Sequence, residues 1–128
     1  MKGELGFRKA ERLCSKKRIE QLFAGDSRSL SAYPLRAVYR ETTSEQPLQL
    51  LISVSKRRFK HAVDRNRTKR LIREAYRLNK HLLLDNLDDK HLDIAFLWIS
   101  DQLSTFPIVE AKVKNLLQRI GENEKLRE

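Results

Sequence analysis

Apolar and polar residues alternate along residues 48–55, and this alternation is typical of a strand with one buried face. Residues 35–41 contain the β-prone pair Val38 and Tyr39 and predict a second strand. Residues 92–99 are apolar at nearly every position, which predicts a third strand in the interior of the sheet. These three segments together indicate a small β-sheet.

Two segments near the ends of the chain have the spacing of helices. The first helix is expected to begin at Ser15, whose hydroxyl can accept a hydrogen bond from the first turn, and to end near Gly25. The last helix is expected to begin near Thr105 and Pro107, because proline is tolerated in a first turn, and to end at Gly121. The charged tail beyond Gly121 is expected to fray.

Residues 62–84 predict a long helix with two unlike sides. Successive residues lie about 100° apart around a helix axis, which sorts this segment into an apolar side and a cationic side. The apolar side is expected to face the core, and the cationic side is expected to face a partner. The apolar side comprises Thr68, Leu71, Ile72, Ala75, Leu78 and Leu82, and the cationic side comprises Arg65, Asn66, Lys69, Arg70, Arg73, Arg77 and Lys80.

The elements together predict an α+β fold. The expected order is α-β-β-β-α-β-α, with a small sheet of about four strands packed against helices as a two-layer sandwich. The chain has 128 residues, of which 40% are hydrophobic, and this is enough for one compact core. We therefore expect a single domain over residues 1–128, with its core at about residues 7–121 and charged ends that can fray.

The positive charge is concentrated in one part of the chain. The formal net charge is +10, and residues 56–80 alone hold eleven Lys or Arg and two acidic residues. Such a segment favours a polyanionic partner, either a nucleic acid or an anionic membrane. No apolar run approaches the roughly 20 residues of a spanning helix, and the N-terminus lacks the apolar core of a secretory signal. We therefore expect a cytoplasmic protein without a membrane partner.

The most informative residues are 53–58 and 62–74, which are SVSKRR and AVDRNRTKRLIRE. Arginine side chains in a first helical turn can bind phosphates, because the guanidinium group donates in a planar fork and the helix N-terminus adds free amides. Asn66 has both a donor and an acceptor, so it can bond a base edge, a 2′-hydroxyl or a neighbouring backbone group. The pattern predicts an RNA-binding surface.

These residues resemble the signature of the protein subunits of bacterial ribonuclease P. The matching residues are SVSK at 53–56, AV at 62–63 and RNRTKRLIRE at 65–74, in this order. The order of elements from about residue 7 to residue 121 fits the same family. Two features depart from the family pattern, because the spacer 58–61 lacks the usual glycine-containing turn and Asp64 places an acid before the basic motif. An acid near a helix start complements the helix dipole, which gives Asp64 a structural role.

The resemblance also implies a function. Members of the family act with a catalytic RNA that removes the 5′ leader from precursor tRNA by endonucleolytic cleavage and leaves a 5′-phosphomonoester. The RNA carries the chemistry, while the protein assists folding of the holoenzyme and binds the leader. Mg²⁺ is expected for the holoenzyme, held mainly by RNA, and no cofactor is expected on the protein itself. The implied partners are ribonuclease P RNA in a 1:1 complex and precursor tRNA, and the protein alone is expected to be a monomer.

The residues that touch RNA are implied by the same resemblance. In the family the basic helix docks on the catalytic RNA, and the leader lies between the first helix and the sheet. Core packing remains an alternative for Phe23, whereas the polar tip of Tyr39 suits a surface position. The implied contacts to ribonuclease P RNA are Arg57, Arg58, Arg65, Asn66, Arg67, Lys69, Arg70 and Arg73, and the implied contacts to the leader are Phe23, Tyr39, Ser53, Ser55 and Lys56.

No catalytic residue and no metal site is predicted within the chain. His61, His81 and His91 are possible acid-base groups, but they lie on different predicted elements and their spacing does not predict convergence. The acidic residues of 85–93 lack the glycine-bearing spacing of a calcium loop. Cys14 is the only cysteine, so an intrachain disulfide is excluded.

Three other functions remain open on the sequence. A general RNA-binding or ribosomal protein could share the basic helix without the ordered signature. A DNA-binding protein could place the helix in a major groove, although the many strands and the lack of an evident helix-turn-helix argue against this class. An autonomous ribonuclease would need a catalytic centre that the sequence does not display. The resemblance favours the ribonuclease P subunit over all three.

Overall fold

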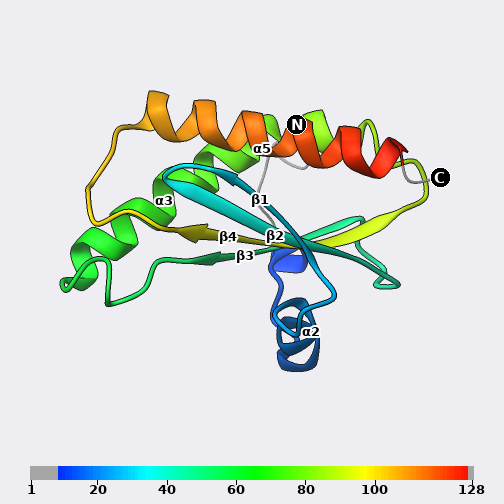
Figure 1. Ribbon diagram of the computed structural model, residues 1–128, viewed down its shortest axis with the longest axis horizontal. Helices are drawn as coiled ribbons and strands as arrows, with labels where there is room; N and C mark the ends of the chain where they lie inside the picture. Colours follow the sequence, from blue (N-terminus) through cyan, green and yellow to red (C-terminus); the bar gives the residue numbers. More distant parts are fainter. Residues whose placement is uncertain (1–8, 127–128) are drawn as a thin grey trace.

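The computed structural model describes residues 9–126, and its centre is a four-stranded sheet (Figure 1). The strands are β1 (Arg28–Ala32), β2 (Leu35–Thr42), β3 (Leu48–Ser53) and β4 (His91–Trp98). Their order across the sheet is β1-β2-β4-β3. β4 is antiparallel to β2 and parallel to β3. This central position explains why β4 is buried along most of its length, as its apolar sequence predicts.

Helices cover the two faces of the sheet unequally (Figure 1). α3 (Ala62–Asn79) and α5 (Phe106–Leu126) pack together on one face, and the short α4 (His81–Leu84) follows α3. α2 (Lys16–Leu22) lies alone on the other face, after the 3-10 helix η1 (Lys9–Glu11). The prediction of an α+β fold with four strands is confirmed. α2 forms a partial third layer that the predicted two-layer sandwich does not contain.

Side-chain alternation along the strands separates two clusters of apolar residues. Leu35, Ala37 and Tyr39 of β2 belong to the main core with α3 and α5. Val38, between them in sequence, belongs to a smaller cluster with Leu22 of α2. β3 divides between the two clusters in the way that its alternating sequence predicts. The sheet therefore supports a large core on one face and a small, partly covered surface on the other.

Several element boundaries differ from the prediction. β1 is short and mostly polar because it is an edge strand, and the sequence pattern does not locate it. The predicted helix 62–84 divides at Lys80 into α3 and α4. Ser15 caps α2 as predicted, because its Oγ accepts a hydrogen bond from the backbone N–H of Arg18 at 3.3 Å. α2 ends at Leu22, earlier than the predicted position near Gly25.

The last helix continues through Gly121, where it was predicted to end, and reaches Leu126. Gly121 is buried, and a Cβ atom at this position would lie 3.4 Å from the side chain of Asn86. Glu124 is fully buried and ion-paired with β1. Gly121 therefore allows the helix to pack closely against Asn86 and does not end the helix. The predicted helix end at Gly121 is wrong, because residues 122–126 continue the helix and the buried Glu124 ties this turn to the sheet.

The buried side of α3 includes residues that the helical pattern did not assign to it. Tyr76 is fully buried, and Lys80 is buried in an ion pair with Glu11 although the pattern placed it on the cationic side. α3 packs against both β3 and α5, which widens its buried side. Of the predicted apolar side, Thr68, Ile72 and Ala75 are buried, and Leu71, Leu78 and Leu82 are partly buried.

The predicted fraying of the extreme ends concerns residues 1–8 and 127–128, which lie outside the described part of the chain. Among residues 9–126, no helix has both the length and the apolar character needed to cross a bilayer.

Candidate nucleic-acid interface

The first two turns of α3 carry exposed polar and cationic side chains. Asn66, Arg67 and Arg70 are exposed and point away from the core. Asp64 is the acidic residue of the first turn, where it complements the helix dipole. The free amides of a helix N-terminus add partial positive charge to that of the two arginines. This helix start can bind phosphate groups.

Arg65 has a structural role in the loop before α3. Its Nη1 donates hydrogen bonds to the backbone carbonyls of Phe59 and Lys60, each at 2.9 Å. These bonds hold the spacer 58–61, which has no glycine to form a tight turn. The guanidinium group therefore orders the loop before α3, and the RNA contact of Arg65 stays a prediction.

The second half of α3 is less cationic than its sequence indicates. Nε and Nη2 of Arg77 donate to the carboxylate of Glu74 at 2.9 and 2.6 Å. This hydrogen bonding lowers the pKa of Glu74 and raises the pKa of Arg77. Lys80 is buried against Glu11, with 2.6 Å between Nζ and Oε1. The cationic surface of the helix therefore lies mainly in its first three turns.

A pocket of about 280 Å³ lies where α3, β3 and the N-terminal segment meet, and we call it the edge pocket. Arg12, Lys69 and Arg73 provide its positive charge. The backbone N–H of Leu13 donates to the carbonyl of Leu50 at 2.9 Å, which holds Arg12 at this place. Within residues 9–126, Nε of Arg73 is buried and has no hydrogen-bond partner. A buried donor of this kind favours an anion in the edge pocket.

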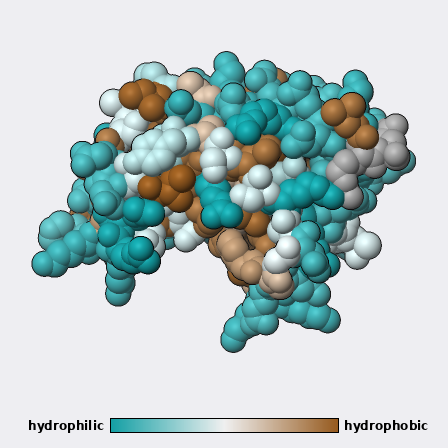
Figure 2. Space-filling view, viewed as in Figure 1, coloured by the Kyte–Doolittle hydropathy of each residue, from teal (hydrophilic) through white to brown (hydrophobic). Residues whose placement is uncertain are grey.

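The face of the sheet that carries α2 is open at one end. Figure 2 shows the molecule hollowed there between two hydrophilic projections, which by their place in Figure 1 are α2 and the start of α3 with the loop before it. We call this hollow the arch. Strand register places four residues side by side across its roof, and we call them the open row: Ser31, Arg36, Leu97 and Ser53.

One wall of the arch is the end of α2. Phe23 caps the C-terminus of α2 and is 48% exposed, so it is a surface residue and not part of the core. It lines a hollow of about 250 Å³ together with Arg36. Nε of Arg36 donates to the hydroxyl of Ser29 at 2.8 Å, which holds the guanidinium group along the sheet. An aromatic ring beside a guanidinium group can bind a base and its phosphate together.

The other wall of the arch joins residues from both predicted RNA-binding sets. Arg58 is ion-paired with the exposed Asp101 at 3.3 Å. The wall contains a hollow of about 320 Å³, which offers hydroxyl groups and cations beside apolar atoms. It is lined by Ser53, Ser55, Arg57, Arg58, Leu97, Trp98 and Ile99, and Lys56 is exposed beside it.

Tyr39 lies in the main core, and its predicted contact with the leader is wrong. The side chain is 0% exposed, and its hydroxyl accepts a hydrogen bond from Nδ2 of Asn123 at 3.3 Å. The reason is side-chain alternation, because Leu35, Ala37 and Tyr39 share one face of β2. Arg36 occupies the opposite face, so alternation along β2 was the signal that could have selected it.

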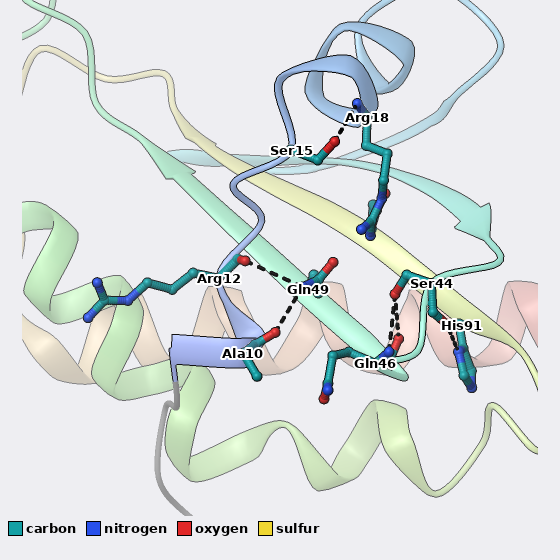
Figure 3. Close-up of polar contacts among 9 residues, drawn as sticks. Ala10, Arg12, Ser15, Arg18, Ser44, Gln46, Gln49 and His91 are labelled. Atoms are coloured by element: carbon teal, nitrogen blue, oxygen red, sulfur yellow. Dashed lines mark hydrogen bonds and ion pairs between the residues drawn. The ribbon is translucent and has the colours of Figure 1, made fainter.

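The histidines lie on separate elements. His61 and His81 are exposed at the starts of α3 and α4, and Nδ1 of His91 is hydrogen-bonded to the carbonyl oxygen of Ser44 (Figure 3). No group of three His, Cys, Asp or Glu side chains in residues 9–126 is placed to hold a metal ion. The exposed side chains of α3 and of the arch can bind phosphates and bases.

The exposed helix start, the edge pocket and the arch define a nucleic-acid-binding protein with an α+β fold. The family model for ribonuclease P matches residues 7–121 of the sequence. The chain belongs to the ribonuclease P protein family, which supplies the subunit that acts with RNA in processing the 5′ ends of tRNA.

Relatives and solved structures agree with this family. The chain is 45% identical over 122 residues to the ribonuclease P protein component of Porphyromonas gingivalis, covering 92% of this chain and 88% of that protein. It is 35% identical over 127 residues to the same component of Chlorobium phaeobacteroides, covering 88% of this chain and 86% of that protein. The structure of the RNase P protein from Thermotoga maritima matches with a TM-score of 0.69 at 26% identity, and the match covers 85% of this chain and 96% of that protein. The RNase P protein of Staphylococcus aureus, with a TM-score of 0.71 at 21% identity and 88% and 96% covered, shares the fold.

Proposed function

We propose that the chain joins one ribonuclease P RNA to the leader of precursor tRNA by means of two adjacent surfaces. The observation that carries the proposal is that the start of α3 bears exposed cations and that the loop directly before it lines one wall of the arch. RNA bound to this helix would therefore lie next to whatever the arch holds. A subunit that presents a substrate strand to a catalytic RNA needs this proximity.

The catalytic RNA is proposed to dock on α3 and the edge pocket. Asn66, Arg67 and Arg70 would contact its backbone from the exposed helix start. The edge pocket would take a phosphate, because Arg73 has a buried donor there and Arg12 and Lys69 add charge. Each neutralised phosphate lowers the repulsion within folded RNA and so favours a compact holoenzyme. The proposed contacts to the catalytic RNA also include Arg57, Arg58 and Arg65, which lie where α3 meets the arch.

The leader is proposed to lie under the open row. The exposed ring of Phe23 would stack on a base, which contributes about 1 to 3 kcal/mol and tolerates any sequence. Arg36 would bind a backbone phosphate beside the ring. Ser53, Ser55 and Lys56 would contact the strand from the other wall. Recognition by stacking and phosphate contacts suits an enzyme that processes many different precursors.

Hydrolysis is proposed to be the work of the RNA. We assign the catalytic metal ions mainly to the RNA and no cofactor to this chain. The protein would contribute affinity and orientation for the substrate. We propose that it acts as a monomer in the cytoplasm, in a 1:1 complex with the RNA.

The proposed function is tested by measuring cleavage of precursor tRNA at near-physiological magnesium. Three reactions are compared, with the protein alone, the cognate ribonuclease P RNA alone, and the two together. We expect strong stimulation only in the mixture. Cleavage by the protein alone would identify an autonomous nuclease, and tight RNA binding without stimulation would identify a general RNA-binding protein.

Replacing Phe23 with alanine is expected to weaken binding of leader-bearing precursor tRNA to the holoenzyme. Loss of one stacking contact corresponds to about 1 to 3 kcal/mol, or about five- to 150-fold in Kd. The Kd for mature tRNA should not change, because mature tRNA has no leader. The matched aromatic control is Tyr39→Phe, which alters a buried ring and should leave both Kd values unchanged. Equal losses for precursor and mature tRNA after Phe23→Ala would remove Phe23 from the leader site.

A further inference from the structure

A row of polar side chains crosses the sheet on its α2 face, away from the open row. Strand register places Arg40 of β2, Asp93 of β4 and Gln49 of β3 side by side, and we call these three residues the polar row. Asp93 lies in the central strand and is only 3% exposed, although it is an acidic residue. Burying a carboxylate without a partner costs free energy, so we look for the residue that pairs with Asp93.

Asp93 is paired with the helix that forms one wall of the arch. Arg18 of α2 donates to both carboxylate oxygens, from Nε to Oδ2 at 3.0 Å and from Nη2 to Oδ1. This fork-to-fork contact restricts both the position and the orientation of the guanidinium group. Figure 3 shows Arg18 extending from α2 toward the sheet. The ion pair therefore ties α2 to the central strand.

Gln49 of the polar row holds the segment that precedes α2. Its Nε2 donates to the backbone carbonyl of Ala10 at 2.8 Å and lies 3.5 Å from that of Arg12 (Figure 3). The approach to α2 and α2 itself are thus attached to one row of the sheet. Asp93 and Gln49 of the polar row therefore help to hold the N-terminal part of the described chain on the sheet.

α2 needs such an anchor because it is short. It has seven residues, and a helix of this length has little stability of its own in water. Its apolar contacts to the sheet come from Ile19, which follows Arg18 in the middle of the helix, and from Leu22 at the end that leads into Phe23. The Arg18 pair adds a directional polar contact to these apolar contacts, and together they restrict the orientation of α2 over the sheet.

We propose that Asp93 is a positioning residue for the leader, acting through Arg18 to hold Phe23 over the hollow that Arg36 lines. The inference rests on the proposed leader site in the arch. Asp93 itself is buried and has no role in touching RNA. Its carboxylate adds a negative charge beneath a surface that binds a polyanion, so electrostatics alone would favour its absence. Its effect on the leader must therefore come from geometry.

The variant Asp93→Asn is diagnostic because charge and geometry predict opposite effects on binding of the leader. The substitution keeps the size of the side chain and removes one negative charge, which by electrostatics alone should strengthen RNA binding. If Asp93 positions α2, the holoenzyme should instead lose about five- to tenfold of its preference for precursor over mature tRNA, comparable with the loss of one stacking contact. The Kd values for mature tRNA and for ribonuclease P RNA should not increase, because Asp93 is paired with α2, whereas the main proposed contacts to the catalytic RNA are on α3.

Two further variants separate geometry from charge and from folding. Glu20→Gln removes a negative charge from an exposed position on the same helix, so it should preserve the preference for the leader. Arg18→Lys keeps the charge and spares the fold but loses the planar fork, so it should lower the preference by about two- to threefold. All variants are measured in the assembled holoenzyme, with the Kd for precursor tRNA divided by the Kd for mature tRNA as the readout.

The outcomes distinguish this inference from the proposed function. Full preference for the leader in both Asp93→Asn and Arg18→Lys, with a loss in Phe23→Ala, would overturn the positioning role and leave the leader site in place. An equal loss for precursor and mature tRNA in Asp93→Asn would also overturn it, because that result indicates general unfolding. A wild-type holoenzyme without any preference for the leader would overturn both.

Discussion

Replacing Arg67 and Arg70 together with alanine is expected to weaken binding to ribonuclease P RNA by about a hundredfold. Both side chains are exposed at the start of α3. A charge-assisted hydrogen bond to phosphate contributes about 1.5 kcal/mol or more, so two of them contribute about 3 kcal/mol. That free energy corresponds to about two orders of magnitude in Kd. The slope of log K against log salt concentration should fall by about two, one for each lost phosphate contact.

The measurement is a titration of labelled RNA at several salt concentrations, with a charge-matched control. Lys114→Ala with Lys125→Ala removes the same charge from exposed positions on α5 and should have a much smaller effect on affinity and slope. Alanine is a good helix former, so the circular dichroism of the α3 variant should match that of the wild type. An unchanged salt slope, or equal losses in both double variants, would remove Arg67 and Arg70 from the interface.

Replacing Phe96 with alanine is expected to lower the free energy of unfolding by about 3 to 5 kcal/mol. Phe96 is fully buried on the central strand, and its ring packs edge-on against Tyr76 with 6.4 Å between ring centroids and 69° between planes. The substitution leaves a cavity between the sheet and α3 and removes an aromatic pair. Small domains have total stabilities of only about 5 to 15 kcal/mol, so a large part of the stability would be lost.

Urea unfolding followed by circular dichroism measures this loss. The control is Leu103→Ala, because Leu103 is 47% exposed and its truncation should cost less than about 0.5 kcal/mol. A loss below about 1.5 kcal/mol for Phe96→Ala would contradict the central place of this ring in the core. RNA binding by the Phe96 variant should recover at low temperature or at high RNA concentration, since RNA binds the folded state and stabilises it.

The two strands β2 and β3 show why sequence patterns predicted some surfaces and not others. Alternation along β3 is regular, so the division of its residues between the two faces was predicted correctly. β2 carries Tyr39, whose polar tip suits a surface, but the hydroxyl is accommodated in the core by Asn123 of α5. These two residues lie 84 positions apart, and no local pattern predicts such a partner. Arg36, and not Tyr39, therefore lies on the face of β2 that borders the arch.

The sequence by itself determined the order of the main elements, the cationic side of α3 and, through the ordered signature, the family. These properties depend on short-range periodicity, capping and residue identity, which are local. Only the tertiary structure decided which distant residues share a surface. The edge pocket unites Arg12 with Arg73, and the ion pair of Arg18 with Asp93 spans 75 positions. Such neighbours are set by strand register and by the docking of α2, which depend on the packing of the whole chain.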